Sequence, residues 1–380
     1  MSVKSPTAQI VTTSKTSFIN KKQKTEVYQE KMTEKLNLSQ GFRAVVVSDF
    51  EKPLAHHVFD SFPELNEDEV LVKNKFLGLN PIDWKAKKYR FGIYHFPWIN
   101  GRESSGVVVM QGDGNVDLLG KRVFISSTSY RDNRTSTFQE YSVMKKSLVW
   151  QLPDFITDIE GATIGVGLVT SSIIIKKSFG LKLEKMSDKN VLIIWGGSTV
   201  VGMYLAQLAK YLGLEVIVIS SLQNKSYLSQ EIKVDKVVDR NQSLDDIKKD
   251  IFEHLDAIGH KTGIKYGVDC VSKETSYDLI SILTDERNTI DSIPEFVGVV
   301  AKPRDVHDVN IKDLVIKRFH EDIDFGAELV QETSKLLNRH IIKPVRYKHF
   351  SGGLESVPQA LQELEATSSF GGKFVVQLLT

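Results

Sequence analysis

Hydrophobic and polar positions follow two different patterns along the chain. From residue 42 to residue 150, short β-rich stretches are separated by turns that contain Gly or Pro. The predicted strands lie at residues 42–47, 69–76, 106–110, 121–126 and 137–143. Short strands at this spacing are typical of a small all-β barrel or sandwich. We therefore predict a β-barrel domain over this part of the chain.

After Pro153 strands and helices alternate. Residues 158–177 have helical spacing, and apolar strands follow at 191–195, 215–221, 236–239, 266–271 and 295–301, with helical stretches between them. Strands that are apolar throughout and alternate with helices predict a parallel sheet covered on both faces. The tail has helices at 325–338 and 354–367 and strands at 344–350 and 374–379.

Composition narrows the classes of function. The chain has 380 residues and a formal net charge of +1, with 41% hydrophobic residues. That length predicts two domains, and the balanced charge argues against nucleic acid or an anionic membrane as a partner. Apolar runs such as residues 191–195 are strand-sized, so we expect no membrane span. The single cysteine, Cys270, excludes a disulfide within the chain and a four-cysteine zinc lobe.

Residues 1–41 differ from the rest. They are rich in Ser, Thr, Lys and Gln, and Glu26 is their first acid. We predict a disordered extension and a cytoplasmic protein. A mitochondrial transit peptide stays open as an alternative, although such peptides favour Arg and this stretch has none.

The turn after the strand at 191–195 predicts a nucleotide site. It joins that strand to a helical stretch at 200–212, which Gly213 should end, and its residues are Gly196, Gly197, Ser198, Thr199, Val200, Val201 and Gly202. A helix N-terminus behind a small-residue turn binds a diphosphate through its unpaired N–H groups and its dipole. Thr199 stands where the middle glycine of the dinucleotide motif is expected, so its Cβ should displace the diphosphate slightly outward. The hydroxyls of Ser198 and Thr199 can offset this by donating hydrogen bonds. The alternative is a glycine-rich turn of another doubly wound protein.

The end of the next strand bears on the type of nicotinamide. NAD enzymes usually carry an acid there, but residues 219–225 contain none. Ser221, Asn224 and Lys225 can accept a 2′-phosphate instead, with Arg240 beyond the third strand as a further cation. NADPH is therefore the predicted cofactor, and the alternative for Lys225 is a solvated helix position.

These residues resemble the zinc-free branch of the medium-chain dehydrogenase/reductase superfamily, closest to fungal alcohol-dehydrogenase-like and stand-alone enoyl reductases. The resemblance covers residues 42–380. It implies an α/β fold with a GroES-like β-barrel catalytic domain (42–165, completed by 325–380) and a doubly wound, parallel-sheet Rossmann domain (166–324). It also implies a small-molecule substrate and a monomer or homodimer.

The resemblance also implies roles for single residues. Asn80, Asp83 and Trp84 match a segment that lines the nicotinamide end of the cleft, while Thr170, Cys270 and Lys373 match positions beside the cofactor. Arg102 replaces the zinc-binding His of zinc alcohol dehydrogenases, and the Cys that relatives carry near Asn80 is absent. A catalytic zinc of the usual type is therefore not expected.

Plainer interpretations stand beside these. Asp83 and Trp84 can cap and pack a helix, Cys270 can be a small buried hydrophobe, and Arg102 can pair with Glu103 to hold the cleft's shape.

Without zinc, no Lewis acid polarises a substrate carbonyl. Reduction of a conjugated C=C depends less on such polarisation than reduction of an isolated carbonyl does.

We predict an NADPH-dependent reductase of an activated alkene, a quinone or a reactive aldehyde. Asn80, Asp83, Trp84 and Tyr94 are the candidate catalytic residues, with Tyr89 also bordering the pocket; Tyr94 or water is the candidate proton donor. A partner-dependent enoyl reductase acting on carrier-bound acyl chains and a non-catalytic NADPH-binding sensor or scaffold stay open.

Overall fold

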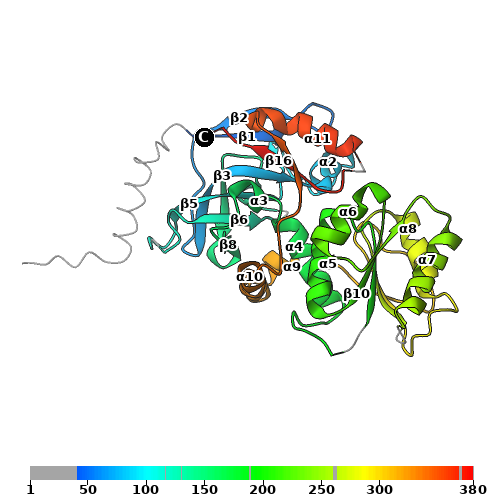
Figure 1. The fold of residues 1–380 in the computed structure, drawn as a ribbon. Coiled ribbons are helices and arrows are strands. Elements are labelled where there is room, and N and C mark those ends of the chain that lie inside the picture. The colour runs from blue at the N-terminus through cyan, green and yellow to red at the C-terminus, as the bar shows by residue number, and fades with distance from the viewer. Residues whose placement is uncertain are drawn as a thin grey trace, which may run out of the picture.

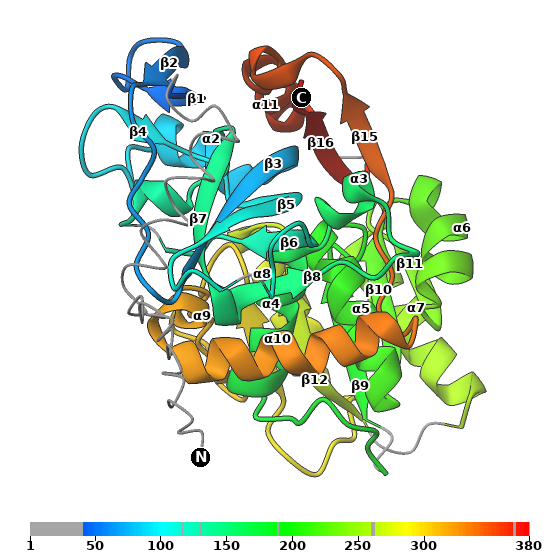
Figure 2. The same cartoon turned by 90° about the vertical axis from the view of Figure 1, so that its left-hand side faces the viewer.

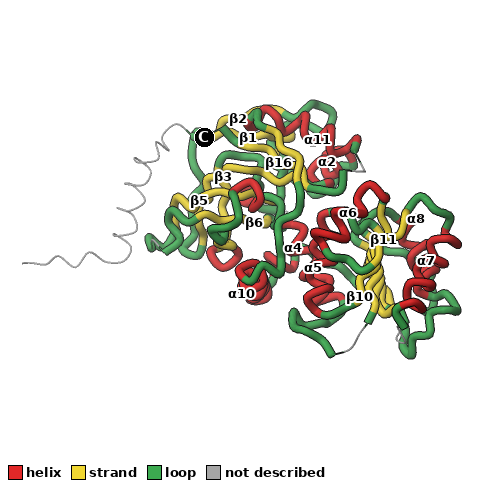
Figure 3. The backbone as a smooth tube through the Cα atoms, in the orientation of Figure 1, coloured by secondary structure: helices red, strands yellow, loops and turns green. Residues whose placement is uncertain are grey.

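The computed structural model describes residues 41–115, 117–129, 131–187, 190–259, 263–367 and 370–379. All of the extension predicted over residues 1–41 except Gly41 lies outside them. The chain forms two lobes, one of which joins its first strands to its last helix and strand (Figure 1). Strands fill the interior of both lobes, and in the second lobe helices surround a central sheet (Figure 3).

The second lobe is built on a six-stranded parallel sheet. Its strands are β9 (Val191–Trp195), β10 (Glu215–Ser220), β11 (Lys236–Asp239), β12 (Ile264–Asp269), β13 (Glu295–Gly298) and β14 (Asn310–Ile311). They lie in the order β11-β10-β9-β12-β13-β14, so the chain changes direction across the sheet between β9 and β12. In doubly wound sheets ligands bind outside the carboxyl ends of the strands at such a point.

Helices cover both faces of this sheet. They are α5 (Val200–Leu212), a 3₁₀ turn Leu222–Asn224 that leads into α6 (Lys225–Tyr227) and a π-helical turn Leu228–Ile232, α7 (Leu244–Ala257) and α8 (Lys273–Leu283). Gly213 ends α5 in the left-handed conformation, with φ 95°. Gly tolerates that conformation at no steric cost, so this predicted helix end is confirmed.

The first lobe is a β-barrel-like pair of sheets. Strands β15 (Tyr347–Phe350), β16 (Lys373–Gln377), β3 (Glu69–Leu79), β5 (Glu103–Gln111), β6 (Arg122–Ser126) and β8 (Val149–Gln151) pair in that order, and β7 (Tyr141–Lys145) pairs with β3. A smaller sheet joins β2 (Ala55–Phe59), β1 (Phe42–Val47) and β4 (Trp98–Ile99). Because β16 pairs with β3, the end of the chain completes the sheet that its beginning starts.

The remaining helices belong to the first lobe and to the junction between the lobes. They are α2 (Pro81–Lys88), α3 (Asp158–Gly161), α4 (Gly165–Ile173) with a π-helical turn Ile174–Ser178, α9 (Arg318–Glu321), α10 (Ile323–Asn338) and α11 (Val357–Ala366), with 3₁₀ turns at Asn133–Thr135, Lys146–Leu148 and Gly353–Ser356. One apolar cluster runs from Phe124 and Trp150 in the barrel through α4 to α5. Helix α10 packs on β8, where Trp150 Nε1 donates to Thr333 Oγ1 at 2.9 Å (Figure 2).

The helical segment Asp158–Ser178 bears on the expectation that no segment spans a membrane. By length and composition alone it could cross a membrane, with a mean hydropathy of 1.4 in its most apolar window. However, 78% of that window is buried inside the fold. This segment is therefore accounted for as a core helix between the lobes.

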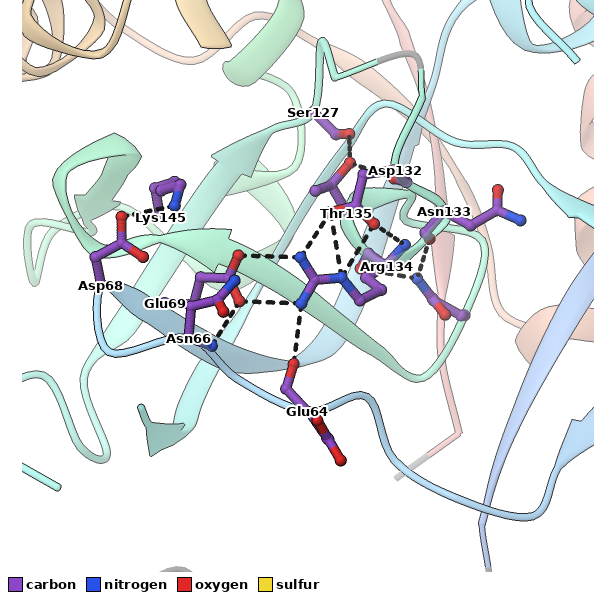
Figure 4. Close-up of polar contacts among 11 residues, drawn as sticks. Glu64, Asn66, Asp68, Glu69, Ser127, Asp132, Asn133, Arg134, Thr135 and Lys145 are labelled. Atoms are coloured by element: carbon purple, nitrogen blue, oxygen red, sulfur yellow. Dashed lines mark hydrogen bonds and ion pairs between the residues drawn. The ribbon is translucent and has the colours of Figure 1, made fainter. Parts of the chain in front are cut away.

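An arginine-centred network fixes the loop between β6 and β7 to the start of β3. Arg134 donates to both carboxylate oxygens of Glu69 at 3.0 Å, to Asp132 and to the Glu64 carbonyl (Figure 4). The Glu69 side chain is 6% exposed. Burial raises the pKa of Glu69, but the hydrogen bonds from Arg134 and Asn66 outweigh it and leave the pKa below its usual value.

Several elements depart from the sequence prediction. The short strands β2, β4, β8 and β14 were not predicted from the sequence. The predicted helix at 158–177 is divided at Ala162–Ile164, and the strand predicted at 266–271 is β12, which ends before Cys270. The domain boundaries at 165/166 and 324/325 stay predictions.

Candidate active site

The glycine-rich turn lies at the carboxyl edge of the sheet, between β9 and α5. Gly196 has φ +85° and donates its N–H to Ile219 O at 2.9 Å, which ties the turn to β10. A Cβ on Gly197 would lie 2.4 Å from Val218, and one on Gly202 would lie 2.5 Å from Gly196 O. These glycines therefore permit the close approach of strand, turn and helix that a dinucleotide turn needs.

Thr199 has a role that the sequence analysis did not assign. It is the N-cap of α5, and its Oγ1 accepts the Gly202 N–H at 3.0 Å. A threonine in place of the middle glycine thus stabilises the helix start, and only its hydroxyl hydrogen can point to a phosphate. Ser198 lies half-buried before it, and Val200 and Val201 supply the first N–H groups of the helix.

The residues predicted to bind the 2′-phosphate gather at the end of β10. Ser221 and Asn224 lie in one 3₁₀ turn, where Asn224 Nδ2 donates to Ser221 Oγ at 3.1 Å. Lys225 follows and is exposed, and Arg240 is an exposed residue whose N–H bonds Ser220 O at 3.0 Å. Asn224 is buried, and its Oδ1 accepts from Arg346, a residue that the sequence analysis missed because it lies 122 positions away.

Thr170 lies in α4, and Cys270 directly follows β12. Thr170 is 1% exposed, and its Oγ1 has no hydrogen-bond partner in the described part of the chain. The Cys270 N–H donates to Trp195 O at 2.9 Å. Burial raises the pKa of the Cys270 thiol to about 12, so the thiol is neutral at physiological pH. Cys270 is partly buried and packs against the large apolar cluster, which agrees with the interpretation of this residue as a small hydrophobe.

A buried polar cluster joins α2, β5, α4 and β16. Lys373 Nζ donates to Asn80 Oδ1 at 2.7 Å and forms an ion pair with Glu103 Oε1. Asn80 Nδ2 also donates to Glu103 Oε1, at 2.7 Å, and Glu103 Oε2 accepts the Val166 N–H at 3.0 Å. The Glu103 carboxylate thereby fixes the Asn80 amide and the Lys373 ammonium. It also fixes the first turn of α4, the helix that carries Thr170.

One interpretation needs correction. Glu103 pairs with Lys373, so the ion pair expected between Arg102 and Glu103 is wrong; successive side chains at the start of a strand point to opposite faces. Lys373 is only 1% exposed and its ammonium is held inside the cluster, while its predicted place beside the cofactor stays a prediction. Its partners Glu103 and Asn80 lie 270 and 293 positions away in the sequence, so no local sequence pattern could predict these contacts.

Asp83 lies beside this cluster and caps α2. Its Oδ2 accepts the Asn80 N–H at 2.8 Å, so the capping interpretation is confirmed. Burial raises the pKa of Asp83 to about 6, although the positive charges of Arg102 and Lys373 oppose the rise. Arg102 is itself 3% exposed. A carboxyl group that titrates near neutral pH in a cluster of charges is a mark of a functional site.

The structure does not bring the other candidates into the cluster. The ring of Trp84 packs on the apolar cluster that includes α11, and Lys85 and Lys88 lie over it at 5.5 and 5.4 Å, which supports its packing role. Tyr94 lies in the loop after α2, is 58% exposed and contacts Trp98 edge-on at 5.6 Å. Tyr89, at the end of α2, is also exposed.

Comparison with known proteins places the fold in a family. The model of the alcohol dehydrogenase GroES-like domain matches residues 66–154. Trans-enoyl reductase pvhC of Talaromyces variabilis is 27% identical over 351 residues, covering 86% of this chain and 94% of that protein. A zinc-type alcohol dehydrogenase-like protein of Schizosaccharomyces pombe is 27% identical over 328 residues, covering 80% and 93%. The solved structure of mycobacterial Rv1454c complexed with NADPH superimposes with a TM-score of 0.69 at 22% identity, covering 89% and 100%.

The chain has the fold of the medium-chain dehydrogenase/reductase superfamily and resembles its enoyl-reductase members over most of its length. The strand order of its second lobe and the GroES-like match in its first lobe confirm the predicted fold class. Its trans-enoyl reductase relatives and quinone reductase neighbours indicate an oxidoreductase that uses a nicotinamide cofactor.

The residues of this chain fit such a cofactor. The glycine cradle has no room for side chains, the helix N-terminus behind it presents N–H groups, and the Thr170 hydroxyl is buried without a partner. Gly196, Gly197 and the first turn of α5 would hold the diphosphate, and Ser221 and Lys225 would face the adenosine ribose.

Proposed function

We propose that this chain is a zinc-independent, NADPH-dependent oxidoreductase that reduces an activated alkene, a quinone or a reactive aldehyde. Zinc independence is supported by the side chains in and beside the buried cluster, which include few groups that bind zinc. Arg102 stands where zinc-dependent relatives have a His ligand, and Lys373 and Asn80 contribute an ammonium and an amide. Cations and amides are poor zinc ligands, because zinc prefers thiolate, imidazole and carboxylate groups.

The edge of β10 supports NADPH. Ser220 and Ser221 occupy the place where an acid would bind a free ribose 2′-hydroxyl, and Lys225 follows them. A carboxylate there would repel a 2′-phosphate, whereas hydroxyls and a cation accept one.

The residues of the site contribute positioning and electrostatics. A bound nicotinamide would supply the hydride, which a conjugated alkene accepts at its β-carbon and an aldehyde at its carbonyl carbon. Thr170 and the turn at Gly196–Gly202 orient the dinucleotide, while the Glu103 cluster fixes the first turn of α4 beneath it. The ion pair of Lys373 with Glu103 and the hydrogen bond of Lys373 to Asn80 hold the wall of the site in place. Tyr94 or water remains the candidate donor of the final proton, and Tyr94 lies 58% exposed outside the buried cluster.

Parallel titration with NADPH and NADH, followed by turnover with a panel of quinones, enals and aldehydes, tests the proposal. We expect tighter binding of NADPH, turnover with at least one substrate class, and no stoichiometric zinc by elemental analysis. A preference for NADH would refute the cofactor assignment. One zinc ion per chain would refute zinc independence, and absence of oxidation with the whole panel would refute the substrate classes.

A second candidate is an enoyl reductase that acts on acyl chains held by a carrier protein. The names of the trans-enoyl reductase relatives favour it. It predicts low activity on free enals and a large gain when the same acyl group is presented on an acyl carrier protein. Equal rates on free and carrier-bound substrates would argue against it. A cytoplasmic location and a monomer or homodimer stay predictions.

A further inference from the structure

Arg346 is a partly buried cation at the boundary between the lobes. It lies just before β15 in the first lobe and reaches the turn after β10 in the second. Its guanidinium lies over the ring of Tyr227 at 4.5 Å and over that of Phe370 at 5.6 Å. Two aromatic faces therefore hold its plane in a fixed orientation.

The hydrogen bonds of Arg346 go to neutral acceptors. Nε donates to Gly371 O at 2.6 Å, and Nη2 donates to Phe370 O at 2.7 Å and to Asn224 Oδ1. Within the described residues no carboxylate forms an ion pair with it, and no hydrogen bond engages Nη1. A partly buried guanidinium with neutral partners keeps its full charge available for an anion.

The position of this charge coincides with the edge of β10. Asn224, which accepts from Arg346, donates in turn to Ser221 Oγ at 3.1 Å. The Asn224 side chain therefore links Arg346 to Ser221, which is proposed to face the ribose 2′-phosphate. It also lines a cavity of about 240 Å³, so its side chain can be reached from solvent; the two carboxylates of that cavity, Glu160 and Glu231, form no ion pair with it.

We propose that Arg346, supplied by the first lobe, is a specificity-determining residue for the 2′-phosphate of NADPH, with Asn224 orienting its guanidinium. This inference rests on the proposed NADPH dependence and deepens it. It also means that the phosphate is recognised from both lobes, so NADPH would hold the lobes together more firmly than NADH does.

The test compares Arg346→Met with the wild type, with Arg346→Lys and with the control Lys343→Met. Lys343 lines the same cavity, and its backbone N–H and carbonyl bond Gln207. Affinities are measured by titration of the full chain with NADPH, NADH, 2′,5′-ADP and 5′-AMP. We expect Arg346→Met to weaken NADPH and 2′,5′-ADP about 10- to 100-fold, the range of a charge-assisted bond, and to change NADH and 5′-AMP less than about threefold.

The remaining variants separate charge from geometry. Arg346→Lys keeps the charge but loses the planar fork, so an intermediate loss is expected, and Lys343→Met should leave the NADPH-to-NADH ratio unchanged. Equal weakening of all four ligands would mean that Arg346 only supports the fold, and an unchanged ratio would overturn the inference directly. A wild type that prefers NADH would instead refute the proposed cofactor.

Discussion

Breaking the ion pair between Lys373 and Glu103 tests the buried cluster. Both side chains are 1% exposed. Replacing one partner leaves the other charge buried without compensation, and such changes are expected to destabilise a fold by about 3–5 kcal/mol. Lys373→Met and Glu103→Gln should each have this effect. The double variant removes both charges together, so its loss should be well below the sum of the two.

Thermal and urea unfolding of the four proteins measure these effects. For domains of this size, 3–5 kcal/mol corresponds to a fall in Tm of about 6–20 °C. The matched control is the pair of Lys88 and Glu365, whose side chains are 52% and 37% exposed. Its single variants should lose less than about 1 kcal/mol, because solvent screens exposed pairs.

Two outcomes would refute this account of the cluster. Losses that add within about 0.5 kcal/mol in the double variant would show that the two side chains do not interact. A loss no larger than that of the Lys88–Glu365 control would show that the ammonium and the carboxylate are solvated, and the cluster could not then position α4 and Asn80 as proposed.

Three further predictions concern the turn, a titrating acid and the arginine network. Gly202→Val should abolish NADPH binding in titration, because a side chain there meets the Gly196 carbonyl, and retained affinity would contradict the cradle. The pKa of Asp83 is about 6 in the folded protein and 3.8 in the free group, so the free energy of unfolding should fall by about 3 kcal/mol as pH rises through the range from 3.8 to 6. Measured as Tm against pH, this fall should be smaller in Asp83→Asn. The same pH slope of Tm in both proteins would refute the prediction. Arg134→Met should cost about 1–3 kcal/mol by urea unfolding, since the buried Glu69 loses its partner, whereas Lys145→Met at the neighbouring exposed pair should be near neutral. Because the pKa of Glu69 is lowered in the folded protein, the stability difference between the wild type and Arg134→Met should be present above pH 4.5 and shrink as pH falls below it. A stability difference that does not change with pH would count against the Arg134–Glu69 pair.

Local features of the fold could be predicted from the sequence. Gly196–Gly202 forms the strand-to-helix turn, Gly213 ends α5, and Asp83 caps α2, because each depends on neighbours within a few residues. The parallel sheet followed from its alternation of apolar strands and helices. Short strands such as β4 were missed, since two residues carry no periodic signal and their pairing with β1 is set elsewhere in the chain.

The sequence by itself therefore determined the fold class and the place of the nucleotide turn, because both are encoded by local geometry and by the period of apolar residues. Only the tertiary structure decided which charges meet. It pairs Lys373 with Glu103 across 270 positions and brings Arg346 to Asn224 across 122. Such contacts depend on how the two ends of the chain close one sheet, and no spacing within the sequence records that closure.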